Sequence, residues 1–543
     1  MQQLEVVVAV LAAVAVLTPL AQRVSLPYPV VLTVFGLGVA LIPGLPTVHV
    51  DPQLLLPLFL PPLLYSASQG TSLAEIRSAL APLLFLAVGL VIITALVVAA
   101  VAHALVPGLP WAVAFVLGAI VSPPDPVAAT SISQQLRLPR RLVTVLEGEG
   151  LFNDATALVL YGVGLDAAVG GHASLLGASA RLAYAAPVSV AIGLAVGWVA
   201  RQLLGRIELP AVENTLVLFV PYAAYLPADA ARASGVLAVL TMGLYLNRHR
   251  YDVVTPSGRL QGRAFWDMID FILTGLAFVL IGLELRQVLP SLRHSGLGSV
   301  LTEAGVVCLT VIGVRFALLL PLSRLSRLVQ ARQERGRQRS DAPGATARRR
   351  VASTLAPSWR ESIVLSWAGM RGVVSLATAL SLPFTTTSGA AFPRRATVVV
   401  AAFAVIVVTL VGQGLTLPAL LRRLGVVGPA EASEREEAAT RAALVRAALR
   451  RLDELAAEQE LPDEVVEGIR SQHNARLERL TRDEDTDDEV AAEQARSRVG
   501  KALLEAERAE LLRLQAIGEV DAVTANRLLH RLDVRSLYFD PGR

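Results

Sequence analysis

"WAVAFVLGAIVSPPDPVAATSI", Trp111 to Ile132, would cross a membrane as one helix if three prolines did not interrupt it. Proline removes an N–H donor and its ring clashes with the preceding turn, so the helix must break between Ser122 and Pro126. Irregular backbone at membrane depth is tolerated where protein or a watery cavity satisfies its polar groups. The stretch therefore predicts a discontinuous membrane helix with Asp125 in its break.

A loop between two short helices, with Asp125 capping the second, is the alternative interpretation. The apolar pieces on either side are each too short to span a bilayer alone. Counting them separately would also reverse the pattern of arginines further along the chain, which favours a single broken span.

The rest of the chain has the composition of a membrane protein. Of its 543 residues, 54% are hydrophobic, and its net charge is only +4. Apolar runs recur at bilayer-spanning length, which predicts an all-α polytopic fold of about thirteen transmembrane helices. The single cysteine, Cys308, allows no intrachain disulfide. No cofactor and no nucleic-acid partner are expected.

The predicted spans are Leu4 to Ala21, Val30 to Ile42, Leu54 to Ala67, Leu80 to Leu105, Trp111 to Ile132, Glu149 to Val169, Tyr184 to Leu204, Thr215 to Leu226, Ser234 to Leu246, Phe265 to Leu285, Leu301 to Leu322, Ile363 to Phe384 and Val398 to Leu421. Glu5 precedes the first span without any basic residue, so we expect a retained helix and not a signal peptide.

Arginines concentrate in the odd-numbered connections, from Arg23 after the first span to the run between Arg324 and Arg360 after the eleventh. The positive-inside rule then places the N-terminus outside and the C-terminus in the cytoplasm. We predict a multi-pass protein of the cell membrane, in contact with membrane lipid. Its transmembrane domain covers residues 1–425 and contains an arginine-rich cytoplasmic connection at 323–360.

Residues 426–543 differ in composition, with leucine and alanine at helical spacing among opposite charges. This pattern predicts a cytoplasmic helical tail, divided into about three helices by Pro462 and the acidic run "RDEDTDDE". Regulation, a dimer contact or a merely solvated tail are all compatible with it.

Acidic residues enter the sixth span, which begins within "EGEGLFNDATALVLY", Glu147 to Tyr161. Glu149 and Asn153 share a helical face, and Asp154 is turned away from them. A charged side chain at mid-bilayer costs roughly 2.5 to 3.5 kcal/mol, so each acid needs a partner, a cavity or a task.

The twelfth span offers a partner, because Arg371 lies between Gly369 and Gly372 in an apolar run. We predict a structural ion pair of Glu149 with Arg371, with a snorkelling arginine as the alternative. Arg315 is expected to snorkel, and Asp267, Asp270 and Glu284 are expected at the membrane interface.

Asp154 is thereby left unpaired. A carboxylate in a cavity holds a proton or a small alkali cation but not both, because the proton occupies the lone pairs and removes the charge. We predict Asp154 as the ion- and proton-binding residue, with Asn153 shaping the pocket and carbonyls near Pro124 and Asp125 completing the cation's shell.

Three motifs together resemble the sodium/proton exchanger branch of the cation/proton antiporter superfamily, the NhaP and YjcE-like group of bacterial exchangers. They are "SPPDPVA", "EGEGLFNDATALVLY" and "GMRGVVSLA", and the likeness covers roughly Leu4 to Gly425. The resemblance implies a homodimer with inverted repeats, crossed broken helices in spans five and twelve, and electroneutral exchange of one sodium ion for one proton.

The resemblance also implies roles for residues. Asp154 matches the family's ion-binding aspartate, Asn153 its neighbour, Asp125 the acid of the break, and Glu149 with Arg371 the stabilising pair. Two positions depart from the family pattern: Pro124 replaces a threonine, and Gly150 replaces a serine whose hydroxyl would lie beside Asp154. The choice of cation is therefore open, with potassium/proton or mixed exchange as the alternative to sodium/proton exchange.

Other classes of function fit less well, and we expect a transporter and not an enzyme. Two intramembrane aspartates could serve a hydrolase as an acid/base pair, but the chain has no HExxH or GxSxG motif. A passive channel would need a ring of like ligands from several subunits.

Overall fold

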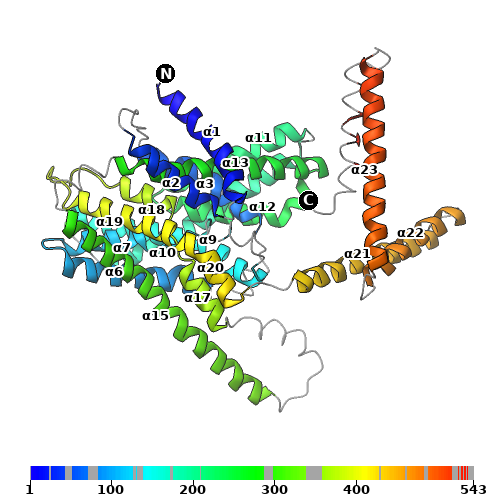
Figure 1. Ribbon diagram of the computed structural model, residues 1–543. Helices are drawn as coiled ribbons and strands as arrows, with labels where there is room; N and C mark the ends of the chain where they lie inside the picture. Colours follow the sequence, from blue (N-terminus) through cyan, green and yellow to red (C-terminus); the bar gives the residue numbers. More distant parts are fainter. Residues whose placement is uncertain are drawn as a thin grey trace. The chain divides into compact units, whose positions relative to one another are not determined.

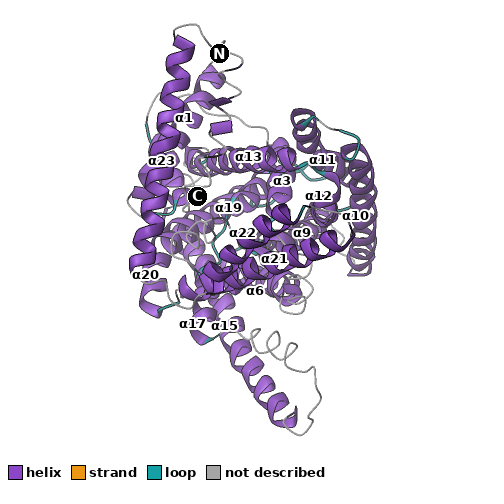
Figure 2. Cartoon of the chain, turned by 90° about the vertical axis from the view of Figure 1, so that its right-hand side faces the viewer, coloured by secondary structure: helices purple, strands orange, loops and turns teal. Residues whose placement is uncertain are grey.

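The computed structural model describes residues 2–23, 26–42, 52–70, 83–125, 127, 130, 138–170, 175–207, 209–286, 297–337, 358–426, 430–458, 462–481 and 487–516, with scattered residues in 524–535. These residues are almost all helical, without a strand among them (Figure 2). The expected all-α fold is confirmed.

The chain divides into two compact units, Met1–Gly428 and Pro429–Arg543. The helices of the first unit (Figure 1) are α1 (Gln2–Arg23), α2 (Tyr28–Ala40), α3 (Pro52–Gln69), η1 (Phe85–Leu90), α6 (Val91–Leu105), α7 (Trp111–Val121), α9 (Arg140–Gly170), α10 (Leu175–Leu204), α11 (Pro210–Ala230), α12 (Gly235–Val253), α13 (Pro256–Leu283), α15 (Leu297–Arg337), α17 (Trp359–Trp367), α18 (Val373–Leu380), α19 (Arg395–Val407), η2 (Val408–Gln413) and α20 (Gly414–Leu424).

Five helical segments of the described part are long and apolar enough to cross a membrane. They are Phe85–Leu105, Ala183–Leu204, Gly258–Leu283, Thr302–Leu322 and Arg395–Leu424. The other predicted spans coincide with helices that are shorter, more polar or interrupted. The total number of crossings therefore stays a prediction.

The break predicted at Ser122 is present, because α7 ends at Val121 and the next four residues are not helical. A second break separates α17 from α18 at residues 368–372, where Gly369 and Gly372 flank Arg371. Serine 358 starts α17 with a capping box that includes Glu361, so the helix begins at a fixed point.

The arginine-rich connection expected from residue 323 begins as a continuation of α15, which runs to Arg337 although its apolar segment ends at Leu322. Arginine, glutamine and leucine are good helix formers, so a membrane helix can extend into water without losing its hydrogen bonds. The rest of the connection, 338–357, lies outside the described residues.

The second unit contains α21 (Ala430–Glu458), α22 (Asp463–Thr481) and α23 (Asp487–Ala516). Helix α22 begins directly after Pro462, and the acidic run lies between α22 and α23. Exposed pairs such as Arg470 with Asp453 join α22 to α21. The location of this unit in the cytoplasm stays a prediction.

Close packing of α2 against α13 depends on two glycines. A Cβ atom on Gly282 would lie 2.4 Å from the Thr33 carbonyl oxygen and 2.5 Å from the Leu37 nitrogen. These neighbours are backbone atoms, which cannot move aside as a flexible side chain can. Gly36 meets the same restriction from the other side, since its Cβ would lie 2.4 Å from the Val279 carbonyl oxygen.

We predict that Gly282→Ala lowers the stability of the detergent-solubilised protein by about 1 to 3 kcal/mol, the usual range for an overpacked core. Gly38→Ala is the matched control, because nothing lies within 4 Å of its added Cβ. Thermal unfolding followed by tryptophan fluorescence measures both. Equal melting temperatures for the two variants would show that the helices separate without cost.

Candidate functional site

The two helix breaks meet each other. The backbone N–H of Asp125, in the first break, donates to the carbonyl of Met370, in the second, at 2.7 Å. Segments that are almost 250 residues apart in sequence are thus hydrogen bonded where neither is helical. The contact satisfies backbone groups that lost their helical partners and that lie away from water.

Arg371 closes the open end of α7. Its Nε donates to the Val121 carbonyl at 2.8 Å, and Nη2 lies 3.4 Å from the Ser122 carbonyl oxygen. These carbonyls have no helical partner, and they carry the negative end of the helix dipole. The guanidinium also bonds to the Gly369 carbonyl, and the Arg371 N–H donates to the Thr409 hydroxyl. Arg371 therefore acts as a buried C-terminal cap.

Asp125 has the corresponding role at a helix N-terminus, that of α18. Its carboxylate accepts the Val127 N–H at 2.9 Å, and the Val373 N–H at the start of α18 is also directed at it. An acid at a helix N-terminus is favourable for the same reasons that an arginine is at a C-terminus. The carboxylate lies so close that a Cβ on Gly372 would be 1.6 Å from Oδ2, so this position requires glycine.

Glu149 pairs with Arg315 and not with Arg371, so the predicted pair is wrong. Two parallel bonds join the carboxylate to the Arg315 guanidinium, at 2.5 and 2.7 Å. Only 2% of Glu149 and 3% of Arg315 are exposed, so Arg315 does not snorkel as expected. No carboxylate in the described part of the chain forms an ion pair with Arg371.

The physical reason lies in the packing of α15. Arg315 reaches α9 and α17 together, because its Nε also donates to the Leu365 carbonyl at 2.9 Å. Gly369 leaves room for it, since a Cβ there would lie 2.6 Å from the Arg315 Cδ. Leu365 is in the last turn of α17, so this arginine caps the helix before the second break.

We predict that Arg315→Ala destabilises the protein by about 3 to 5 kcal/mol, the range for removing one partner of a buried ion pair. Adding Glu149→Gln should recover part of the loss, because the orphaned charge disappears with it. The same Glu149→Gln change should not rescue Arg371→Ala. Folded protein is measured by size-exclusion chromatography of the detergent extract. If Glu149→Gln rescued Arg371→Ala but not Arg315→Ala, the result would support the pair of Glu149 with Arg371 instead.

Asn153 is tied to the first break. Its Nδ2 donates to the Pro124 carbonyl at 2.6 Å, while the Oδ1 atom is buried with no hydrogen-bond partner in the described structure. Asn153 is fully buried, and neither it nor Pro124 lines the neighbouring cavity, although Pro123 does. The structure therefore places Asn153 and Pro124 behind the cavity wall.

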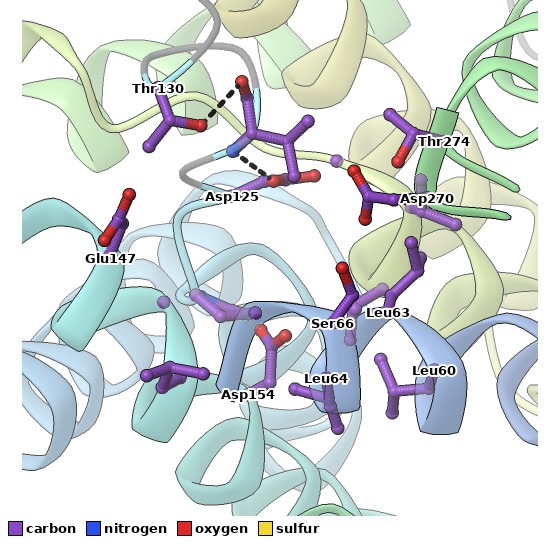
Figure 3. A pocket seen from close by; sticks show the side chains of 18 of the residues that line it. Leu60, Leu63, Leu64, Ser66, Asp125, Thr130, Glu147, Asp154, Asp270 and Thr274 are labelled. Atoms are coloured by element: carbon purple, nitrogen blue, oxygen red, sulfur yellow. Dashed lines mark hydrogen bonds between the residues drawn. The ribbon is translucent and has the colours of Figure 1, made fainter. Parts of the chain in front are cut away.

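A cavity of about 420 Å³ lies beside the two breaks (Figure 3). Its lining includes four carboxylates, those of Asp125, Glu147, Asp154 and Asp270, and no lysine, arginine or histidine among the described residues. The hydroxyls of Tyr28, Ser66, Thr130, Thr274 and Ser375 also line it. Such a collection of oxygen atoms without a basic residue favours a cation.

Asp154 projects into this cavity from α9 (Figure 3). It has no hydrogen bond or ion pair with any residue that the structure describes, and its side chain is only partly buried. Gly150, one turn earlier, lines the cavity beside it and offers no side-chain oxygen. Of the predicted site residues, Asp125 and Asp154 thus reach the cavity.

Asp270 lines the cavity, although it was expected at the membrane interface. Helix α13 starts at Pro256, so Asp270 is fourteen residues inside it and not at its end. The signal that could have found it is the spacing of Asp270, Thr274 and Phe278, four residues apart, which all line the cavity on one helical face.

Interrupted helices that meet beside an acidic cavity, inside a body of apolar helices, define a secondary transporter. Residues 9–423 match the family described as the transmembrane sodium/hydrogen exchangers. The chain belongs to this family of multi-pass membrane transporters, and the resemblance of its motifs to the exchanger branch is confirmed.

Individual relatives agree with this assignment. An uncharacterised Na⁺/H⁺ exchanger of Mycobacterium tuberculosis is 37% identical, with 87% of this chain and 84% of the relative aligned. The uncharacterised exchanger YjcE of Escherichia coli is 29% identical, with 94% of each chain aligned. The fold is similar to that of the sodium proton antiporter MjNhaP1 from Methanocaldococcus jannaschii, with a TM-score of 0.57 at 18% identity, over 78% of this chain and 99% of that one.

Proposed function

We propose that this protein exchanges sodium ions for protons across the membrane, one for one, by competition at Asp154. One observation carries the proposal: among the acids around the breaks, Asp154 alone combines access to the cavity with the lack of a described partner. Glu149 is held by Arg315, and Asp125 accepts backbone N–H groups. Only a carboxylate that is free of fixed partners can release one ligand and take another.

The electrostatics of the cavity support this role. Asp125 lies close enough to Asp154 to interact with it electrostatically, and no basic side chain lines the cavity in the described part of the chain. Two neighbouring carboxylates without a counterion favour the uptake of one positive charge, either a proton or an alkali cation. Because both bind the same oxygen atoms, they exclude each other.

The backbone near the break supplies further ligands in this proposal. Pro124 does not line the cavity, so in this proposal its carbonyl, which accepts from Asn153, fixes the neighbouring backbone of Pro123 and Asp125, which do line it. Asn153 holds that carbonyl in place and so shapes the site without lining the cavity. Sodium prefers hard oxygen ligands such as carboxylates, carbonyls and water, and a cavity of about 420 Å³ admits water to complete the shell.

On the predicted orientation, this cavity belongs to the cytoplasmic side. Gly70 directly follows α3 and Thr130 precedes α9, next to odd-numbered connections that contain Arg77 and Arg137. Exchange then requires the loaded site to be presented alternately to the two faces of the membrane. The resemblance also implies a homodimer, which we keep as part of the proposal.

Potassium/proton exchange by the same machinery is the second candidate. Gly150 leaves the turn beside Asp154 without a hydroxyl, so the ion keeps an extra water molecule or a wider shell there. A wider shell discriminates less between sodium and the larger potassium ion.

We predict that Asp154→Asn abolishes exchange in proteoliposomes while the protein remains folded, because an amide offers no charge to either ligand. Asp166→Asn is the matched control, since Asp166 is exposed on the same helix and lies outside the cavity. The assay follows the collapse of an imposed pH gradient when sodium is added. Wild-type rates for Asp154→Asn would refute the proposed site.

We also predict that protons and the cation compete. Lowering the pH should raise the sodium concentration for half-maximal exchange, by up to about tenfold per pH unit where the site is mostly protonated, since one proton displaces one cation. Adding sodium, potassium or lithium in turn identifies the accepted ions. Half-saturation that does not change between pH 6 and pH 9, the range that we would test, contradicts binding at a shared carboxylate.

A further inference from the structure

Helix α13 contributes a second polar group to the cavity, on the side opposite α9. Asp270 and Thr274 are four residues apart, so they lie on the same face of the helix, and both line the cavity. In Figure 3 the Thr274 hydroxyl and the Asp270 carboxylate lie next to each other, and the Ser66 hydroxyl of α3 faces the same carboxylate. Three oxygen-bearing side chains from two helices therefore converge.

The Thr274 hydroxyl is unusual among the helical threonines of this protein. Thr241, Thr310 and Thr378 each donate to the carbonyl four residues earlier. Thr274 is 2% exposed, and its Oγ1 atom has no hydrogen-bond partner in the described structure. A buried hydroxyl normally has a partner, so this oxygen atom is available to something that enters the cavity.

The charge of Asp270 also lacks compensation by the protein. Asp267 and, more weakly, Asp125 are near enough to repel it, and the cavity lining has no basic residue in the described structure. The nearest acid on the same helix, Asp267, is exposed and lies outside the cavity. A positive ion would neutralise Asp270 and bind the hydroxyl oxygen of Thr274 in the same place.

We propose that Asp270 and Thr274, with Ser66 facing them, form a second alkali-cation site in the cavity, separate from Asp154. This inference rests on the proposed function, because the ion is the one that Asp154 exchanges. One carboxylate and two hydroxyls are hard, weakly charged ligands, which suit a monovalent cation that must leave again. The second site holds the cation near Asp154 while Asp154 still carries a proton.

The first test measures the sodium dependence of exchange in proteoliposomes of the full chain. Asp270→Asn should raise the sodium concentration for half-maximal exchange about tenfold or more, since a charged ligand is lost, and Thr274→Val about threefold. Asp166→Asn and Thr310→Val are the matched controls, because neither side chain lines the cavity. Both controls should keep the wild-type value.

The second test isolates the new site in protein that cannot exchange. In Asp154→Asn protein, sodium chloride should still raise the melting temperature above that found with equal choline chloride. Adding Asp270→Asn should abolish that rise, and adding Thr274→Val should shift it to about threefold higher sodium concentration. The Thr274→Val version keeps this test decisive if Asp270→Asn does not fold.

The outcomes separate the two proposals. Wild-type sodium dependence in both Asp270→Asn and Thr274→Val overturns the second site and leaves Asp154 in place. A change in the pH profile alone, with unchanged half-saturation at alkaline pH, shows that Asp270 binds a proton and also overturns it. Exchange by Asp154→Asn protein would instead refute the proposed function itself.

Discussion

The structure depends on how two broken helices satisfy each other inside an apolar body. Arg371 belongs to the second break and caps the carbonyl end of α7, while Asp125 belongs to the first break and receives the N–H groups that start α18. Each break thus provides the charged side chain that the other requires. Neither helix end could remain in a bilayer without this exchange, because every unsatisfied backbone group there costs several kcal/mol.

This arrangement also decides which acids are available for chemistry. Asp125 is engaged by backbone N–H groups, and Glu149 is engaged by Arg315, which caps the other broken helix at Leu365. The structural charges are therefore matched, and the cavity keeps carboxylates that the protein does not neutralise. Asp154 is one and Asp270 is another, and they approach the cavity from different helices. The proposed exchange uses these carboxylates, which no basic side chain neutralises.

Much of the fold follows from the sequence, because its signals are local. Three prolines after Val121 locate the first break, and the apolar runs locate the helices. The partner of Glu149 could not be found in this way. Arg315 and Arg371 both lie in apolar runs, and helical periodicity gives the face of a residue but not the helix that packs against it. The three-dimensional packing of α15 between α9 and α17 decides the pair.

Asp270 was misplaced for a related reason. Hydropathy placed the start of its span at Phe265, but α13 begins at Pro256, so the side chain lies deeper than its position in the apolar run indicated. Asp154, in contrast, was recognised because a motif surrounds it. We expected Asp154 to lack a partner because Arg371 would pair with Glu149. Asp154 does lack a described partner, but the arginine that pairs with Glu149 is Arg315.

The bond from Asn153 to the Pro124 carbonyl has a mechanical consequence. Asp154 is the next residue, so the carboxylate, the first break and, through Asp125 and Met370, the second break form one cross-linked block. The opposite wall of the cavity, on α3 and α13, contacts this block partly through apolar side chains such as Val374. Apolar contacts can shift without breaking hydrogen bonds. In the proposed exchange, this apolar contact on the side of the cavity that carries Asp270 is the place where the block, with its ion, would move against α3 and α13.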